Sequence, residues 1–374
     1  GVNPSRASLE KGGFFFIISV DISSLFKDKA YSFREISDNE EEKNFAKITL
    51  NKFLPDFNIK KIDSSVVFDH YDIFSVYNQQ NEKFTFKISL DDSENILKKE
   101  STFLKNHKSA HIPEIVKYGR VKIGDEMSCL LSRVPEGENI RNHGRSIILN
   151  QLQEFRDSYT NVFLQTKTNR RSYKGYINSF CDKLNPEKFL NDESINSFKA
   201  YTDYDLCVSF IKELKKQIKN SLVYVYEDLN YNCHTGMSLD SIFYGSGGFY
   251  YDYLHNVSRG HPLVDFIDIL LELGVSSYDD KRLAVHFCEE LKIKYDQNIY
   301  DSIYQVQLRK KLAELVISYI KEVYLFDSFR YERIFYIADT FSHCYKRFCS
   351  IDIFEKNKEF IMKTICEPIF GVKA

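Results

Sequence analysis

The hydrophobic positions in the first third of the chain mostly follow the period-two pattern of β-strands. Residues 84–89 alternate apolar and polar side chains, residues 73–77 form a short apolar run, and the polar residues 78–82 lie between them. Two strands joined by a short polar segment form a hairpin, so we predict one here. A weaker alternation over 57–63 and an apolar run over 127–134 predict two more strands.

A helix is predicted after this hairpin. Asp92 or Ser93 can cap its first turn, and the apolar side chains between residues 96 and 104 are spaced as on one helix face. Pro113 ends the segment that follows. The charged run 38–43 predicts the solvated start of another helix.

Beyond about residue 145, the apolar positions change to the i, i+3, i+4 spacing of α-helices. This spacing predicts helices over residues 149–164, 204–223, 263–273, 281–293, 305–325, 330–349 and 354–366. Between the second and third of them, residues 226–262 are irregular and rich in glycine. We therefore expect an α+β protein with a strand-rich part followed by a mostly helical part.

The composition is that of a folded globular protein. Hydrophobic residues make up 43% and charged residues 28% of the 374 residues, which excludes a disordered chain. The formal net charge is -2, so no excess of positive charge points to nucleic acid or a membrane surface as a partner. The longest apolar run, residues 14–20, is too short to span a membrane, and no cleavage-site pattern of a secretory signal follows it.

The eight cysteines are scattered without the spacing of a disulfide framework or a zinc site. Reduced thiols in a cytoplasmic protein are the better interpretation. His343, Cys344 and Cys349 could form part of a metal site, but no second pair of ligands follows them. We therefore expect these cysteines to be buried thiols on a C-terminal helix.

The strand-rich part carries candidate chemistry for phosphoryl transfer. That reaction depends on positioning the phosphate groups and on neutralising their charge. A Lys on a strand, held in place by a Glu on a helix, is suited to both tasks. Lys87 lies in the second strand of the hairpin and Glu100 in the helix after it. An isolated Lys on a strand is usually solvated, but the order of Lys87, Glu100 and a later apolar strand ending at Gly137 favours an ion pair.

The irregular region carries a second set of motifs. Residues 234–243 read His-Thr-Gly-Met-Ser-Leu-Asp-Ser-Ile-Phe. A hairpin predicted over 245–248 leads into a strand that ends in Asp252 and Tyr253. Residues 260–265 read Gly-His-Pro-Leu-Val-Asp and open a predicted helix.

Together these segments, between about residues 45 and 275, resemble the aminoglycoside phosphotransferase and choline kinase family. In that family a strand Lys is followed by E-x-x-x-L and then V-P-x-V-L-x-Y, which resemble residues 100–104 and 112–118 here. The catalytic loop of the family reads H-G-D-L-x-x-x-N-I-L, which residues 234–243 match in part. An I-D-W metal motif and a G-D-P-x-x-D-L segment come after that loop.

The resemblance implies a two-lobed protein kinase-like α+β fold, with a small antiparallel β-lobe and a larger, mostly helical lobe. We expect the β-lobe over residues 1–135, including an N-terminal extension over 1–45. The helical lobe would cover residues 136–374, with the catalytic-type loops in 226–262.

The resemblance also implies roles for single residues. Lys87 and Glu100, with Arg133 from the strand that resembles the hinge, would lie on the nucleotide side. Asp252 and Ser241 occupy the metal-binding positions. ATP and Mg²⁺ are therefore the implied cofactors.

Three departures from the family pattern weaken this reading. Gly236 stands where the family has the Asp that accepts the substrate proton, and removing a positioned base costs on the order of 10²–10⁴ in rate. Ser241 replaces a metal-binding Asn and is a weaker ligand. The turn over 66–72 lacks Gly and carries Asp69 and Asp72, which would repel a triphosphate at close range.

Substitutes for the missing base can be named. Asp240 is the first candidate and Asp228 the second, although either is more commonly a surface or capping residue. His234 is a third, although in the family this His supports the loop. Asp265, which supports the backbone of the catalytic loop in the family, is retained.

The chain keeps most of the residues that the resemblance matches but lacks the proton-accepting Asp. We therefore predict a kinase-fold protein that is catalytically impaired and has a binding or regulatory role. Its binding of ATP and Mg²⁺ should be weakened. The alternative is an active, atypical ATP-dependent phosphotransferase that acts on a small hydroxylated or amine-bearing molecule. A nucleotidyl transfer, hinted at only by Asp69 and Asp72, and an α+β scaffold unrelated to kinases also remain open. The identity of a small-molecule or protein partner is not encoded in any motif.

Overall fold

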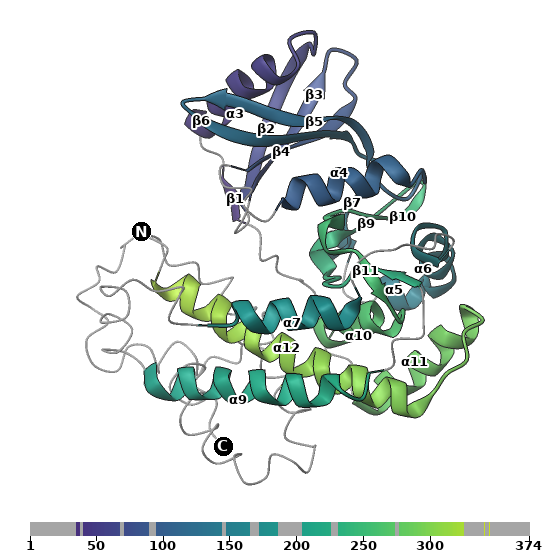
Figure 1. Ribbon diagram of the computed structural model, residues 1–374. Coiled ribbons are helices and arrows are strands. Elements are labelled where there is room, and N and C mark those ends of the chain that lie inside the picture. Colours follow the sequence, from purple (N-terminus) through teal and green to yellow (C-terminus); the bar gives the residue numbers. More distant parts are fainter. Residues whose placement is uncertain are drawn as a thin grey trace, which may run out of the picture.

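The computed structural model describes residues 35–37, 40–67, 71–89, 95–143, 147–164, 172–185, 204–225, 231–273 and 277–324, together with Thr340 and Cys344. Within them, a small sheet stands on a larger, mostly helical body (Figure 1). This is the two-lobed α+β arrangement expected from the sequence. The helices predicted over 330–349 and 354–366 lie outside the described residues, apart from Thr340 and Cys344.

The β-lobe is an antiparallel sheet with the strand order β1-β2-β3-β4-β6-β5. Its strands are β1 (Glu35–Ser37), β2 (Ile59–Val67), β3 (Asp72–Asn78), β4 (Lys83–Ser89), β5 (Glu114–Ile123) and β6 (Asp125–Arg133). Two helices accompany the sheet, α3 (Glu40–Phe53) and α4 (Ile96–Asn106).

The two helices lie against opposite faces of the sheet. Leu50 of α3 packs in one hydrophobic cluster with Phe86 and Leu131. Because successive side chains of a strand point to opposite faces, Lys87 and Leu130 face the other way, and Leu130 belongs to the cluster that contains the apolar side chains of α4. The alternation in β4 therefore turns a lysine toward the helical lobe.

The hairpin predicted in the β-lobe is confirmed. Strands β3 and β4 pair antiparallel, and Asn78 Oδ1 accepts hydrogen bonds from the backbone N–H groups of Gln80 and Glu82 in the turn. The prediction that Asp92 or Ser93 caps the following helix is wrong. Helix α4 begins later, after Asn95, which has a left-handed φ of 54° and makes no side-chain capping bond.

Strand β5 was not predicted from the sequence. It is an edge strand that pairs only with β6, and most of its side chains are exposed or half-buried, so the alternation that marks a half-buried strand is absent. Its register also shifts between Ile115 and Lys117, which breaks the period further.

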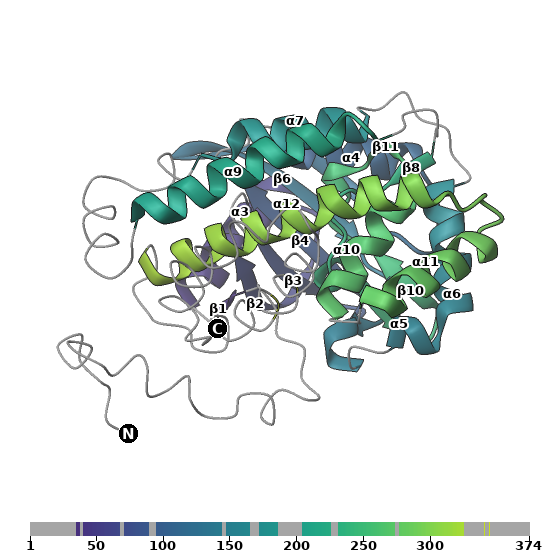
Figure 2. The same ribbon diagram turned by 90° about the horizontal axis from the view of Figure 1, so that it is seen from below.

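The helical lobe is built around a buried central helix. Its helices are α5 (Ile147–Asn150), α6 (Leu152–Tyr159), α7 (Tyr173–Lys183), α9 (Tyr204–Leu222), α10 (Leu263–Leu273), α11 (Ser277–Glu290) and α12 (Gln297–Tyr324). Every residue of α10 is buried. Helices α9 and α12 lie side by side, as Figure 2 shows, and α12 also packs on α10.

Short strands lie between the lobes and form two small antiparallel sheets, in the orders β10-β9-β7 and β11-β8. The strands are β7 (Glu138–Asn139), β8 (Tyr231–Cys233), β9 (Ile242–Gly245), β10 (Gly248–Tyr251) and β11 (Ser258–Gly260). The hairpin predicted over 245–248 is confirmed, because Gly245 and Gly248 face each other across β9 and β10.

The predicted helices agree best with the structure where the helical spacing of apolar residues is strongest. The prediction over 263–273 coincides with α10, and that over 204–223 with α9. The segment 149–164 is instead divided into α5, α6 and a π-helical turn over Thr160–Leu164. Helix α12 begins eight residues before the predicted 305, and α7 was not predicted.

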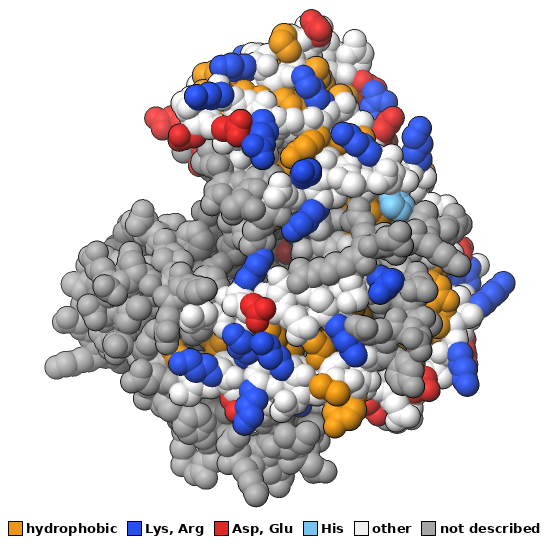
Figure 3. Space-filling view, in the orientation of Figure 1, with side chains coloured by type: hydrophobic (Ala, Val, Ile, Leu, Met, Phe, Trp, Pro, Cys, Tyr) orange, Lys and Arg blue, Asp and Glu red, His pale blue; other side chains and the backbone are white. Residues whose placement is uncertain are grey.

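Charged side chains lie mostly on the surface of both lobes. In Figure 3, Lys and Arg side chains are spread over the β-lobe and over the helical lobe on the face shown. Among the described helices, none has the length and apolar character to cross a membrane. Some charged side chains are instead fully buried between and within the lobes, which is rare for charged residues unless they are paired.

Candidate functional site

One buried lysine joins the two lobes. Lys87 Nζ on β4 donates hydrogen bonds to Glu100 Oε1 of α4 at 2.6 Å and to Asp252 Oδ1, just after β10, at 2.7 Å. All three side chains are buried, and Lys87 has no exposed surface. The Lys–Glu pair and the metal-position Asp suggested by the sequence are therefore brought together, in direct contact rather than across an open cleft.

Two tyrosine rings enclose the same ammonium group. Lys87 Nζ lies 4.6 Å from the centre of the Tyr253 ring and 5.9 Å from that of Tyr71, within the range of cation–π attraction. Tyr253 has a left-handed φ of 60°, and its backbone N–H donates to Asp252 Oδ1 at 2.7 Å. The ammonium is thus held by Glu100 and Asp252 and faced by two aromatic rings.

The electrostatics of the cluster follow from burial and charge count. Burial alone would lower the pKa of Lys87, but Asp252 and Glu100 outweigh it and raise that pKa. Burial raises the pKa of Glu100 to about 7, although Lys87 opposes the rise. Burial tends to raise the pKa of Asp252. The attraction of Lys87 and the hydrogen bond from the Tyr253 N–H outweigh burial and hold this pKa below its usual value. Asp252 is therefore the more readily ionised of the two carboxyl groups that contact Lys87.

The loop after β8 is held by Asp265 of α10. The carboxylate accepts hydrogen bonds from the backbone N–H groups of His234 at 2.6 Å and Thr235 at 2.8 Å, and from Tyr159 Oη at 2.7 Å. His234 is buried, which lowers its pKa, so its neutral ring donates from Nε2 to the backbone oxygen of Asp252 at 2.8 Å. The loop is thus fastened both to α10 and to the Asp252 turn.

Gly236, which the sequence resemblance aligns with the proton-accepting Asp, follows this fastened segment. It has a φ of +130°, a region that side-chain-bearing residues rarely adopt. A Cβ at this position would lie 3.4 Å from Tyr176 Oη and 3.7 Å from Asn256 Nδ2. Space for a small side chain exists, but the backbone conformation is one that favours glycine.

Ser241 and Asp240 lie in the short 3₁₀ turn that follows. Ser241 Oγ donates to the backbone oxygen of Ser238 at 2.8 Å and accepts from the Ser238 N–H at 3.1 Å, so it closes a capping box. The backbone oxygen of Ser241 accepts from the N–H of Asp252 at 3.0 Å. Asp240 is buried in the same turn. Asp228 and Asp69 lie outside the described residues.

This arrangement does not fit the Mg²⁺ ion that the resemblance implies. Mg²⁺ prefers six oxygen ligands in nearly ideal octahedral geometry. Asp252 Oδ1 already accepts from Lys87 and Tyr253, and Ser241 Oγ is used within its own turn. Among the described residues, no three His, Cys, Asp or Glu side chains are grouped so that they could hold a metal ion.

Arg133 does not join the cluster. Its guanidinium lies 3.2 Å from Glu82 and 3.9 Å from Glu114 at the half-exposed end of β6, over the ring of Phe84. The register explains this position, because Leu130 rather than Arg133 pairs with Lys87 across β4 and β6. The structure therefore separates Arg133 from the other residues expected on the nucleotide side.

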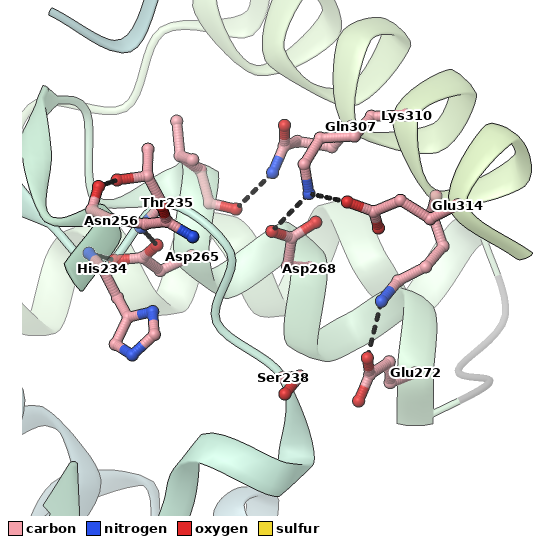
Figure 4. A network of polar contacts seen from close by, with 12 residues as sticks. His234, Thr235, Ser238, Asn256, Asp265, Asp268, Glu272, Gln307, Lys310 and Glu314 are labelled. Carbon is pink, nitrogen blue, oxygen red and sulfur yellow. Dashed lines mark hydrogen bonds and ion pairs between the residues drawn. The ribbon is translucent and has the colours of Figure 1, made fainter. Parts of the chain in front are cut away.

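A second group of buried charges joins α10 and α12 beside the loop (Figure 4). Lys311 Nζ pairs with Glu272 Oε1 at 2.6 Å, and Lys310 Nζ pairs with Glu314 Oε1 at 3.1 Å. Asp268 lies 3.6 Å from Lys310 Nζ, and neither of its oxygens has a hydrogen bond. Sequence reasoning missed this group. The signal that could have found it is acidic residues four positions apart in the otherwise apolar helix 263–273.

Similarity to known proteins is found in the fold and not in matches to family models or curated sequences. No protein-family model and no curated protein sequence matches the chain. Among solved structures, the apo form of a thermostable mutant of aminoglycoside phosphotransferase APH(4)-Ia has a TM-score of 0.53 at 10% identity, covering 82% of this chain and 98% of that one. Amicoumacin kinase hAmiN, in complex with AMP-PNP, Ca²⁺ and Ami, also has a TM-score of 0.53, at 11% identity, covering 83% and 94%.

A ternary complex of an APH(4)-Ia mutant with ADP and hygromycin B gives a TM-score of 0.52 at 11% identity, over 80% of this chain and 96% of that one. The chain therefore has the two-lobed fold of these phosphotransferases, and the resemblance found in the sequence is confirmed at the level of the fold. At such low identity, the likeness shows the fold alone.

Replacing Lys87 should test whether it is a structural residue. In K87M, Glu100 and Asp252 lose the cation with which both pair, and removing one partner of a buried ion pair costs about 3–5 kcal/mol. We expect a loss of that size in the free energy of unfolding, measured with urea. Adding D252N should restore part of it, whereas K99M, on the exposed side of α4, should change little. A K87M protein as stable as the wild type would contradict the structural role.

The pH dependence of stability should reveal Asp268. Burial raises its pKa to about 7, above the ordinary 3.8, so the folded state keeps a proton that the unfolded state releases. Its contribution to stability is therefore lost as the pH rises toward 7. Between pH 5 and 7 this amounts to about 2 kcal/mol. In D268N the fall in unfolding free energy between these pH values should be smaller by that amount, while Glu100 leaves a residual slope of the same sign. Equal slopes in both proteins would show that Asp268 titrates normally.

Proposed function

We propose that this chain is a kinase-fold protein with impaired phosphoryl transfer, which acts as a binding or regulatory module in the cytoplasm. The observation that carries the proposal is Gly236, with its left-handed backbone, at the position of the proton-accepting Asp. Loss of a positioned base reduces the rate on the order of 10²–10⁴. The buried, free thiols of Cys129 and Cys233 are compatible with a reducing compartment.

The contacts of Lys87 support weak nucleotide binding. A phosphate group could reach the ammonium only if the bond to Asp252 opened and the rings of Tyr71 and Tyr253 moved aside. Each of these contacts would be given up in exchange for the phosphate, so little net affinity would remain. Because the residues around Asp252 do not fit Mg²⁺, what nucleotide binding remains should not depend on the metal.

The alternative is an active, atypical phosphotransferase for a small hydroxylated or amine-bearing molecule. One observation favours it, namely that Gly236 and the buried carboxyl of Asp268 line the same pocket. A carboxyl whose pKa is raised by burial to about 7 is suited to proton transfer near neutral pH.

A binding and turnover experiment separates the two functions. ATP binding is measured by calorimetry with Mg²⁺ and with EDTA, and phosphate release is followed with labelled ATP. We expect weak binding that is equal in both conditions, and no phosphate release above that of D252A. Mg²⁺-dependent release that disappears in D252A would overturn the proposal and favour the alternative.

A further inference from the structure

A small cavity lies between the first turn of α7, strand β11 and the first turns of α12. Helix α7 lies beside β11 in the views of Figure 1 and Figure 2. The volume of the cavity is about 10 Å³, which is roughly what a single water-sized particle needs. Its polar lining residues are Ser172, Tyr173, Lys174, Arg259 and His261.

His261 brings an unused hydrogen-bond donor to this cavity. The residue is 4% exposed, and its Nδ1 accepts from the backbone N–H of Leu263, at the start of α10, at 3.1 Å. Burial lowers the pKa of His261 to about 4, so the ring is neutral and its single proton lies on Nε2. That nitrogen is buried and has no hydrogen-bond partner. Native proteins rarely leave a buried donor unsatisfied, so an acceptor is expected in the cavity.

The other polar side chains of the lining also offer donors. Arg259 Nε is buried without a hydrogen-bond partner, and Lys174 adds a second positive charge. Neither side chain forms an ion pair with a carboxylate of the described residues. Ser172 Oγ accepts from the backbone N–H of Gly175 at 3.2 Å, which leaves its own hydrogen available to donate. The first turn of α7 contributes the positive end of the helix dipole to the same cavity.

Acceptors are scarce around the cavity. Within the described part of the chain, no Asp or Glu lines it. The carboxylate of Asp296 acts on His261 from nearby, but its Oδ1 accepts the N–H groups of Asn298 and Ile299 at the start of α12. A water molecule would need acceptors for its two hydrogens, whereas an anion only accepts. The lining therefore suits an anion better than a water molecule.

We propose that this cavity binds a chloride ion, held by Arg259 Nε, His261 Nε2 and the first turn of α7. The volume admits a monatomic ion, whereas a carboxylate or phosphate group would require the wall to move. A bound chloride would join α7 to β11, whose partner strand β8 leads directly into the loop at His234. The family segment G-D-P-x-x-D-L, which residues 260–265 resemble, has Asp in place of His261, so the family pattern does not account for this donor.

The test measures the melting temperature of the full chain, without nucleotide, as sodium chloride replaces sodium gluconate at constant ionic strength. Gluconate serves as an anion too large for the cavity. For the wild type we expect a rise that saturates, because a ligand that binds only the folded state stabilises it. Bromide should act as chloride does, and acetate should have no saturable effect. In crystals grown with sodium bromide, anomalous scattering should locate a bromide ion in the cavity.

Matched variants make the result specific. H261N keeps an acceptor for the Leu263 N–H but removes the Nε2 donor, and R259Q removes the Nε donor together with the positive charge. In each, the affinity for chloride should fall at least about tenfold, because a hydrogen bond to a charged group is lost. K174Q and K216Q make the same change inside and outside the cavity, since Lys216 is exposed on α9. K174Q should weaken chloride binding, and K216Q should leave it unchanged.

Several outcomes would overturn the inference: no saturable effect of chloride on the wild type, no bromide in the cavity, equal affinity in R259Q or H261N, or an effect of acetate equal to that of chloride. If neither R259Q nor H261N folds, K174Q decides, and binding equal to that of K216Q would then overturn the inference. No measurement involves nucleotide or phosphate release, so failure here is distinct from failure of the proposed function.

Discussion

The bridge formed by Lys87 is the interaction on which the rest of the site depends. One ammonium pairs with two carboxyl groups that belong to different lobes, and all three groups are removed from water. Such a cluster persists only when every charge keeps its partner, because a single unpaired buried charge is far more costly than the pair is stabilising. Lys87 therefore ties the β-lobe to the helical lobe at this point.

The loop beside the bridge is held by a small set of buried hydrogen bonds. Asp265 binds two successive backbone N–H groups, and His234 reaches the backbone of Asp252, so the loop connects α10 to the cluster around Lys87. None of these bonds needs a side chain at position 236. The shape of the loop is thus held by residues other than the one at position 236.

Much of this site could be predicted from the sequence, because its parts depend on local periodicity and spacing. The alternation of residues 84–89 turns Lys87 away from α3, and the apolar helix 263–273 carries Asp265 at its start. Long-range features could not be predicted. The enclosure by Tyr71 and the charges of α12 beside α10 depend on how distant segments meet, and the position of Arg133 depends on strand register.

The backbone at Gly236 also limits how this loop can vary. With a φ of +130°, the position suits glycine and strains a residue that carries a side chain. A side chain placed there would begin beside Tyr176 and Asn256, directly after the two residues whose backbone Asp265 holds. A chemical change at this position is therefore coupled to a change in the shape of the loop.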